Sequence, residues 1–159
     1  MNLSVLRIAL FLFSLWLVNR CTPEHNAQKE MQPKIDKLLG YWNTGNFDDI
    51  ENTLHEEFEM RMSPLFEPEP GIESFKESVK KTREKYPDFT IKILEAIYGD
   101  SAGAGRWTMT ATSKSGKKLN VMGISILHFK DGKIKDEWIS SGDLLWMQQL
   151  GYTLTPPQE

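Results

Sequence analysis

An apolar stripe at helical spacing marks the first well-defined segment of the chain. Five residues share one face of an α-helix: Met31, Ile35, Leu38, Leu39 and Trp42. Proline lacks the N–H that a helix interior needs, so Pro33 is placed in the first turn and the helix is predicted to begin near Gln32. Gly45 in "NTGN" is predicted to end it. The polar residues 22–30 that precede it are interpreted as a tether.

Shorter patterns follow this helix. Asn46 is predicted to cap a short second helix, with Asp49 three residues later in a capping-box-like position. Strict alternation in "EFEMRM" (57–62) predicts a half-buried strand. Its inward face carries Phe58, Met60 and Met62. The prolines of "SPLFEPEPG" predict a loop, and a helix is predicted from about Ile72 until "YPD" breaks it.

The remainder of the chain reads as strands. Four are predicted: 89–98, 105–112, 118–129 and 133–140. The turns "SKSGKK" and "KDGK" join the last three as antiparallel hairpins, and a short helix closes the chain. Helices followed by antiparallel strands favour an α+β fold. We predict a cone in which a curved antiparallel sheet packs on the N-terminal helices and encloses an apolar hollow.

The first 21 residues form a separate pattern. Arg7 precedes an apolar run over 8–18, about half of the roughly 20 residues that a membrane-spanning helix needs. This run is typical of a secretory signal peptide. Cys21, directly after it, resembles the acylated cysteine of bacterial lipoproteins, although Asn19 and Arg20 replace the small residues usual there. Soluble secretion and an uncleaved anchor are the alternatives.

Charge and cysteine usage limit the partners that the chain after the signal, residues 22–159, can have; its folded domain is predicted over residues 31–159. The signal holds two of the 19 basic residues and no acid, which leaves 17 basic against 22 acidic residues. No basic run is interleaved with aromatics, so we expect no nucleic-acid partner. No spacing of histidines, cysteines and acids suggests a metal site. We expect export to the bacterial cell envelope with membrane contact only through lipid on Cys21, or else a soluble periplasmic or secreted protein.

Asp143 is the leading candidate for chemistry. It follows Gly142 after the last predicted strand, near Trp138 and Trp146. At the mouth of an apolar cavity, partial loss of water would make its carboxyl a better acid/base. Aspartate is also a favoured N-cap, so the alternative is that Asp143 only begins the terminal helix.

Two other acids are weaker candidates. If Trp138 points inward, Asp136 shares its face of the strand and Glu137 does not. Asp136 is then either a second pocket acid or a solvated charge. Glu95 interrupts the apolar strand "IKILEAIY" and either faces the pocket or is turned outward by a bulge, because a buried acid needs a partner.

Large aromatic and methionine side chains either fill the core or line the hollow. Methionine adapts to varied ligands, so a hollow lined in this way would suit a flat apolar molecule. The candidates for pocket lining are Trp42, Phe58, Met60, Met62, Phe75, Trp107, Met109, Trp138, Trp146 and Met147.

Four segments resemble the SnoaL-like (polyketide or ester cyclase-like) branch of the nuclear-transport-factor-2 (NTF2-like) fold. They are "YWNTGNFDDI", "GIESFKESVKKTREKYPDF", "GRWTMTATS" and "GISILHFKDGKIKDEWISSGDLLWMQQLG", in this order over roughly residues 32–152. The last segment is the most specific. The resemblance implies a cone-shaped α+β barrel, a pocket for a small and mostly apolar molecule, no metal or cofactor, and often a homodimer formed through the sheet.

The resemblance also implies a role for Asp143, because cyclases of this family use an aspartate as acid/base and Asp143 matches best. Two histidines common in the family enzymes are missing, since "FEMRM" has none and Ser113 stands where another is expected. The first hypothesis is a cofactor-free cyclase, isomerase or hydrolase with Asp143 as acid/base. The second is a non-catalytic envelope lipoprotein that binds a ligand or a partner. A third is a dimerisation domain whose own side chains fill the cavity.

Overall fold

The computed structural model describes residues 23–62 and 67–155. The predicted signal peptide and the predicted acylation site Cys21 lie outside the described residues. No helix among the residues that the structure describes is long and apolar enough to cross a membrane.

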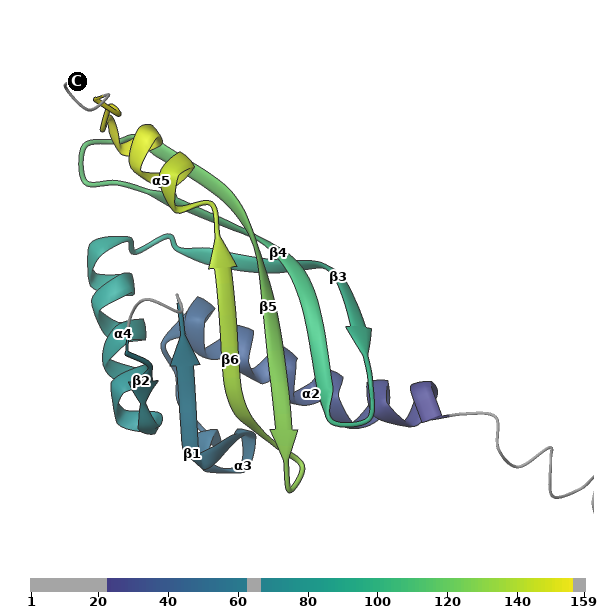
Figure 1. Cartoon of the computed structure of the whole chain (residues 1–159). Helices are drawn as coiled ribbons and strands as arrows, with labels where there is room; N and C mark the ends of the chain where they lie inside the picture. The colour runs from purple at the N-terminus through teal and green to yellow at the C-terminus, as the bar shows by residue number, and fades with distance from the viewer. Residues whose placement is uncertain (1–22, 63–66, 156–159) are drawn as a thin grey trace, which may run out of the picture.

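One curved sheet of six strands organises the described part of the chain (Figure 1). The strands are β1 (Leu54–Arg61), β2 (Glu69–Pro70), β3 (Thr90–Tyr98), β4 (Ala102–Thr112), β5 (Lys118–Lys130) and β6 (Lys133–Ser141), in the order β2-β1-β6-β5-β4-β3. Neighbours are antiparallel except for β1 and β6, which run parallel. The sheet is therefore open and mostly antiparallel, as the predicted α+β class requires.

Within residues 23–62 and 67–155, four helices accompany the sheet: α2 (Pro23–Thr44), α3 (Ile50–Thr53), α4 (Gly71–Lys85) and α5 (Asp143–Leu150). In Figure 1, α2 crosses the concave side of the sheet, α4 flanks β1, and α5 lies against the far end of β5. Asn43 ties the end of α2 to β3, because its side-chain amide bonds both the N–H and the C=O of Ile91 at 2.7 and 3.0 Å. These two hydrogen bonds fix which face of α2 points toward the concave side of the sheet.

The first helix begins earlier than the sequence pattern indicates. α2 starts at Pro23, so most of the predicted tether 22–30 is helical, and Pro33 lies inside the helix. Pro33 can be accommodated because its missing N–H would have bonded the carbonyl of Lys29, and both residues are exposed, so water can solvate that carbonyl. Ala27 and Met31 are buried and extend the apolar stripe toward the N-terminus.

The predicted cap of the second helix is wrong. Asn46 instead makes an Asx turn, in which its side-chain oxygen accepts a hydrogen bond of 3.0 Å from the N–H of Asp48. The helix begins at Ile50, after Asp49 in a left-handed conformation. The strand that follows also begins earlier than predicted, at Leu54, and ends before Met62.

The local patterns of the hairpins are confirmed. β5 is buried at every second residue, and the β5–β6 turn places Asp131 and Gly132 at positive φ, as a tight Asp-Gly hairpin turn requires. The two-residue strand β2 was not predicted. It pairs with β1 within the proline-rich segment.

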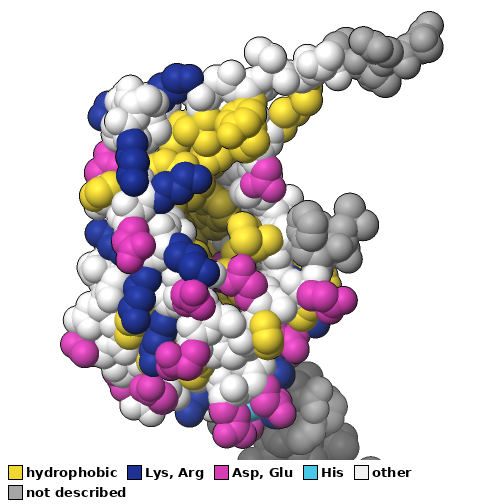
Figure 2. All heavy atoms as spheres, turned by 90° about the vertical axis from the view of Figure 1, so that its left-hand side faces the viewer, with side chains coloured by type: hydrophobic (Ala, Val, Ile, Leu, Met, Phe, Trp, Pro, Cys, Tyr) yellow, Lys and Arg dark blue, Asp and Glu magenta, His cyan; other side chains and the backbone are white. Residues whose placement is uncertain are grey.

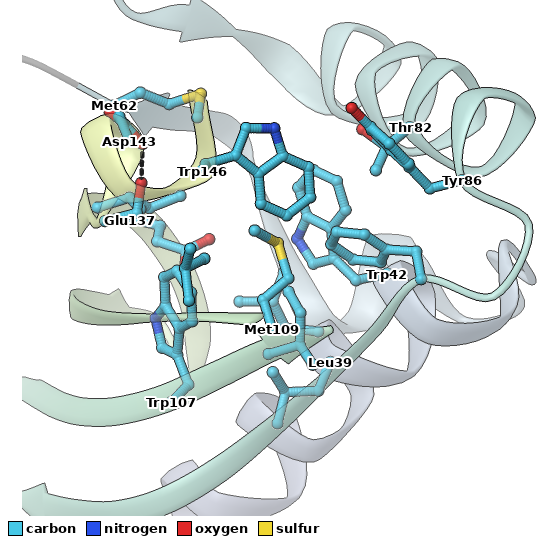
Figure 3. A pocket seen from close by; sticks show the side chains of 16 residues that line it. Leu39, Trp42, Met62, Thr82, Tyr86, Trp107, Met109, Glu137, Asp143 and Trp146 are labelled. Atoms are coloured by element: carbon cyan, nitrogen blue, oxygen red, sulfur yellow. Dashed lines mark hydrogen bonds between the residues drawn. The ribbon is translucent and has the colours of Figure 1, made fainter. Parts of the chain in front are cut away.

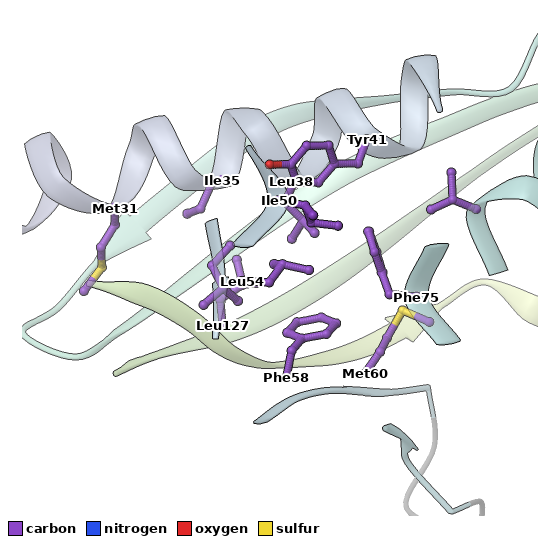
Figure 4. Close-up of a cluster of buried hydrophobic side chains, with 12 residues drawn as sticks. Met31, Ile35, Leu38, Tyr41, Ile50, Leu54, Phe58, Met60, Phe75 and Leu127 are labelled. Atoms are coloured by element: carbon purple, nitrogen blue, oxygen red, sulfur yellow. The ribbon is translucent and has the colours of Figure 1, made fainter. Parts of the chain in front are cut away.

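The hydrophobic core lies between α2, α3, α4 and the β1–β6 side of the sheet (Figure 4). Phe75 is its centre, because its ring meets those of Phe58 and Trp42 edge-on at 5.6 and 5.5 Å. Phe58, Met60 and Phe75 are almost fully buried. These three side chains therefore fill the core, and the prediction that they line the pocket is wrong.

Candidate functional site

A cavity of about 250 Å³ opens between α2, the end of α4, the concave face of β3–β6 and α5. Figure 2 shows it as a hollow with hydrophobic walls and with lysine and arginine side chains along part of the rim. Its wall is mainly apolar and includes Leu38, Leu39, Trp42, Met62, Phe89, Ile91, Trp107, Met109, Val121, Ile139 and Trp146. The volume is close to the lower end, about 300 Å³, of typical small-molecule sites.

One strand brings the polar groups into this cavity. Glu137, Ile139 and Ser141 alternate along β6, and Asp143 follows at the start of α5, so all four line the same wall. Figure 3 shows Glu137 and Asp143 on this side of the cavity. Glu137 is only 7% exposed, whereas Asp143 is exposed. The wall therefore carries one buried acid and one acid at the mouth.

A β-bulge decides which acid of β6 faces the cavity. Ile134 pairs with Phe129 of β5, and Asp136 pairs with the preceding His128, so Lys135 is an extra residue. The bulge shifts the alternation by one, which turns Glu137 inward. The expectation that Glu137 points away from the pocket is thus wrong.

The other residues of β6 change sides for the same reason. Trp138 faces outward, with the guanidinium of Arg61 5.0 Å from its ring centre. Asp136 also lies outside the cavity, where its carboxylate bonds Nδ1 of His128 at 2.6 Å. The predictions that Trp138 and Asp136 line the pocket are therefore wrong.

In the described part of the chain, hydrogen bonds reach Glu137 from one side only. Nε1 of Trp107 donates to Oγ of Ser125 at 2.9 Å, and the Ser125 hydroxyl bonds the Glu137 carboxyl. Among the residues that the structure describes, none bonds Oε2 of Glu137. Burial raises the pKa of Glu137 from its ordinary value near 4.5 to about 7, and the bond from Ser125 only partly opposes this shift. Glu137 can therefore both take up and release a proton near neutral pH.

A glycine makes room for the Trp107 ring. Gly123 of β5 lies directly opposite Trp107 of β4. A Cβ at Gly123 would lie 2.2 Å from two atoms of the indole ring, a distance that side chains do not reach. The absence of a side chain at position 123 therefore lets the indole lie against β5, with its N–H beside Ser125.

Tyr86 forms the opposite wall, at the end of α4 (Figure 3). Its ring meets that of Trp146 edge-on at 5.2 Å, which links α4 to α5 across the cavity. The hydroxyl of Tyr86 is buried and has no hydrogen-bond partner among the described residues. Glu137 and Tyr86 thus place two unpaired polar atoms in side chains on opposite walls of one apolar space.

Asp143 occupies the first turn of α5. Gly142 is the N-cap, and the Asp143 side chain makes no capping bond, so the predicted capping role is wrong. Its carboxylate accepts a hydrogen bond from the hydroxyl of Ser141 instead. Its position at the cavity mouth agrees with the expected one, and its catalytic role stays a prediction.

Comparisons with known proteins agree with this architecture. The model of the SnoaL-like polyketide cyclase family matches residues 35–150. A candidate polyketide cyclase from Bacillus cereus is 30% identical over 77% of this chain and 80% of its own, with a TM-score of 0.68. TsrD from Streptomyces laurentii is 20% identical over 78% of this chain and 96% of its own, with a TM-score of 0.70. No curated protein was found with significant similarity.

The chain belongs to the SnoaL-like polyketide cyclase family. A SnoaL-like candidate cyclase from Jannaschia, 14% identical over 85% of this chain and 98% of its own with a TM-score of 0.71, shows the same fold alone. The predicted family and the NTF2-like fold are therefore confirmed.

Five of the predicted pocket residues line the cavity of this SnoaL-like domain: Trp42, Met62, Trp107, Met109 and Trp146. Glu95 does not line the cavity, because a bulge after Ile93 turns its side chain outward. There its Oε2 lies 3.4 Å from a guanidinium nitrogen of Arg106. Met147 is exposed on α5 and is not part of the cavity wall.

Sequence reasoning missed Glu137, Ser125 and Tyr86. The alternation of β5 placed Ser125 on the buried face, and that signal was available in the sequence. Glu137 depends on the bulge at Lys135, which no local pattern marks. Tyr86 belongs to the "YPD" segment, which was expected to break the helix, and the structure reveals its unpaired hydroxyl.

Proposed function

We propose that this SnoaL-like domain binds a small, mostly apolar carbonyl compound and moves a proton on it without a cofactor, with Glu137 as the acid/base. The observation that carries the proposal is a buried carboxyl with an unpaired oxygen in the wall of an apolar cavity. Family membership supports a cyclase-type domain. The identity of the acid/base and the ligand are our inference.

The proposed step is proton abstraction next to a carbonyl group. The carboxylate of Glu137 takes a proton from the carbon, the C–H bond breaks, and its electron pair forms the enolate. Return of the proton to the same carbon gives exchange alone, whereas return to a different carbon of a conjugated enolate or to its oxygen completes an isomerisation. Attack of the enolate carbon on a second carbonyl closes a ring, and the alkoxide that forms takes the proton back from Glu137. A base with a pKa near the working pH suits this task, because it is present in both protonation states.

Asp143 is the other candidate for the same role. It lies at the mouth, exposed and bonded to Ser141, whereas Glu137 is buried deeper along the same wall. Burial raises the pKa of Glu137, which makes its carboxylate a stronger base toward a carbon acid. We therefore favour Glu137.

Deuterium exchange into β-tetralone tests this proposal, because this two-ring ketone has acidic hydrogens beside its carbonyl. The protein is expected to speed exchange in heavy water, followed by proton NMR, and Glu137→Gln is expected to slow it by about 100-fold or more. Glu95→Gln, which alters an exposed acid outside the cavity, is the matched control and should keep the full rate.

The same assay separates the competing functions. A large loss in Asp143→Asn with little loss in Glu137→Gln would move the role to Asp143. No exchange above the rate in buffer would contradict proton transfer on this ketone class. The non-catalytic alternative is a domain that holds an apolar ligand or a partner at the cell envelope through a lipid on Cys21, and the mainly apolar cavity wall favours ligand binding.

We also propose that two copies associate through the outer face of the sheet. Met122, Ile124 and Ile126 project from the outer face of β5 and remain exposed, and Trp138 adjoins Ile126 across the strand pair. Exposed apolar side chains that adjoin in this way are typical of protein contact surfaces.

A further inference from the structure

The terminal helix α5 and the segment after it carry a large exposed apolar surface. Five large side chains are at least 40% exposed there: Leu144, Leu145, Met147, Tyr152 and Leu154. We call them the α5 surface. Successive residues of a helix point about 100° apart, so the apolar run 144–147 surrounds α5 and the sheet alone cannot cover it. Exposed apolar side chains gathered in this way indicate a surface that a partner covers.

Lysine side chains flank the α5 surface. Nζ of Lys117 donates to the carbonyl of Leu150 at 2.6 Å, so the tip of the β4–β5 hairpin lies against the end of α5. Lys114, Lys117 and Lys118 are all exposed at this tip, and we call them the hairpin lysines. Figure 1 shows the hairpin tip and α5 together at one end of the molecule. Figure 2 shows hydrophobic side chains at this end, with basic side chains beside them.

The balance of charge at this end is opposite to that of the chain as a whole. Residues 113–120 and 144–155 contain three lysines and no acid, whereas residues 22–159 contain 17 basic and 22 acidic residues. Asp88 and Asp143 lie nearby, and each accepts a hydrogen bond from a neighbouring hydroxyl group. Three lysines against two acids leave this end of the molecule positive.

The lysines of this end are also free to meet a partner. On the outer face of the sheet, the carboxylate of Asp136 is paired with His128. Among the residues that the structure describes, the hairpin lysines form no such pair, since Lys117 and Lys118 donate to uncharged oxygens. Unpaired cations next to leucines and a tyrosine match a partner that has an anionic surface and an apolar interior. An anionic lipid bilayer has both.

We propose that this end of the molecule lies on the surface of an anionic lipid bilayer, with the α5 surface among the outer parts of the acyl chains and the hairpin lysines against the phosphate groups. With eight residues, α5 is too short to span a bilayer, so it lies in the plane of the surface. Trp146 of α5 lines the cavity, so the cavity mouth lies beside the lipid, from which an apolar ligand would enter. Entry of a ligand rests on the proposed function, whereas the lipid contact does not, and it needs no lipid on Cys21.

Amide hydrogen exchange tests the contact in the full chain, with no ligand present. Mass spectrometry follows exchange over residues 143–155 in buffer, with vesicles of phosphatidylcholine, and with vesicles in which about a third of the lipid is phosphatidylglycerol. The anionic vesicles are expected to slow exchange about fivefold or more, and the neutral vesicles much less. Residues 50–61, in α3 and β1, are the internal reference and should exchange at one rate throughout. The neutral vesicles also control for attachment of the chain through residues 1–21.

Lys114→Glu together with Lys118→Glu is expected to remove this slowing, because each lysine at an anionic surface strengthens binding about fivefold. Lys29→Glu, which reverses the charge of an exposed lysine in α2, is the matched control and should keep the slowing. Slowing that persists in the double variant would contradict a role for the hairpin lysines.

The apolar side chains are tested in the same way. Leu144→Ser together with Leu154→Ser is expected to weaken the slowing, because less apolar area then enters the lipid. Ile97→Ser, at an exposed position of β3, is the control and should not change it. All of these variants alter exposed residues, so their melting temperatures should stay close to that of the unaltered protein.

Other outcomes would also overturn the inference. Equal slowing by neutral and anionic vesicles, or none by either, would exclude a contact with anionic lipid. Exchange that slows without vesicles as the protein concentration rises would assign the α5 surface to a second copy of the chain. Slow exchange without vesicles at every concentration would mean that the chain itself covers this surface. None of these results depends on deuterium exchange into β-tetralone, because the lipid contact needs neither Glu137 nor a ligand.

Discussion

At the scale of single residues, the carboxyl group of Glu137 links stability to pH. Burial raises its pKa to about 7 in the folded chain, while the unfolded chain has the ordinary value near 4.5. Between these values the folded state keeps a proton that the unfolded state has released. Stability therefore falls as pH rises through this window, because ionising the buried carboxyl costs free energy.

Glu137→Gln should remove this dependence. The gain in unfolding free energy of the variant over the unaltered protein is expected to grow by roughly 3 kcal/mol between about pH 4.5 and pH 7, and then to level off. Urea denaturation at several pH values measures it. Other titrating groups cancel in the difference, so a gain that stays constant with pH would contradict the burial of an ionisable carboxyl.

A second prediction at this scale concerns Gly123. Gly123→Ala would push the Trp107 indole off β5 and break its bond with Ser125, so we expect a loss of about 1–3 kcal/mol and a changed tryptophan emission spectrum. Gly40→Ala in α2 is the control. A Cβ there meets nothing within 4 Å, and alanine should stabilise the helix by up to about 1 kcal/mol. Similar melting temperatures for both variants would show that position 123 accommodates a Cβ without displacing Trp107.

At the scale of secondary-structure elements, α5 closes the cavity but buries none of its own residues. Two attachments to the β4–β5 hairpin and β5 hold it. The Gln149 side chain bonds both the C=O and the N–H of Asn120 at 2.9 and 2.8 Å, and Nζ of Lys117 donates to the carbonyl of Leu150 at 2.6 Å. The helix is thus pinned at its C-terminal end.

Gln149→Ala should loosen α5 without unfolding the sheet. Loss of the paired bonds to Asn120 is expected to speed amide hydrogen exchange across α5 by about tenfold, because each bond contributes about 1 kcal/mol. Gln148→Ala, on the exposed face of the same helix, is the control and should leave exchange unchanged. Equal exchange in both variants would mean that Trp146 and Lys117 alone hold the helix.

The strands also show which features of the structure could be predicted from the sequence. The strands β3 to β6 and the Asp-Gly turn follow from alternation and turn chemistry, which are local. The bulge at Lys135 does not, because it arises where β6 changes register against β5 and also pairs with β1, far away in the chain. The extra residue Lys135 places Glu137, and not Trp138, in the cavity wall. The fold could therefore be predicted from the sequence, whereas the buried acid could not.

At the scale of the whole molecule, the two faces of the sheet have different roles. The concave face and its helices form the core and the cavity, whereas the outer face of β5 and β6 exposes large apolar side chains. Those side chains favour the dimer that we propose, in which both cavities would stay open on the far side of the interface.

Ile124→Lys should therefore yield monomers. A lysine near the centre of the outer face would place like charges against each other in a symmetric pair, and light scattering after gel filtration should report one chain's mass. Leu154→Lys, which changes an exposed leucine outside the sheet, is the control and should remain dimeric. A monomeric unaltered protein would contradict the proposed dimer without affecting the cavity.

The most direct test of the account is a carbon-13 NMR titration of the Glu137 side-chain carboxyl, assigned by the signal that disappears in Glu137→Gln. We predict a midpoint near pH 7, well above the ordinary value of 4.5, because this carboxyl is buried in the cavity wall. A midpoint near the ordinary value of 4.5 would show a solvated carboxylate and would contradict Glu137 as the acid/base of this site.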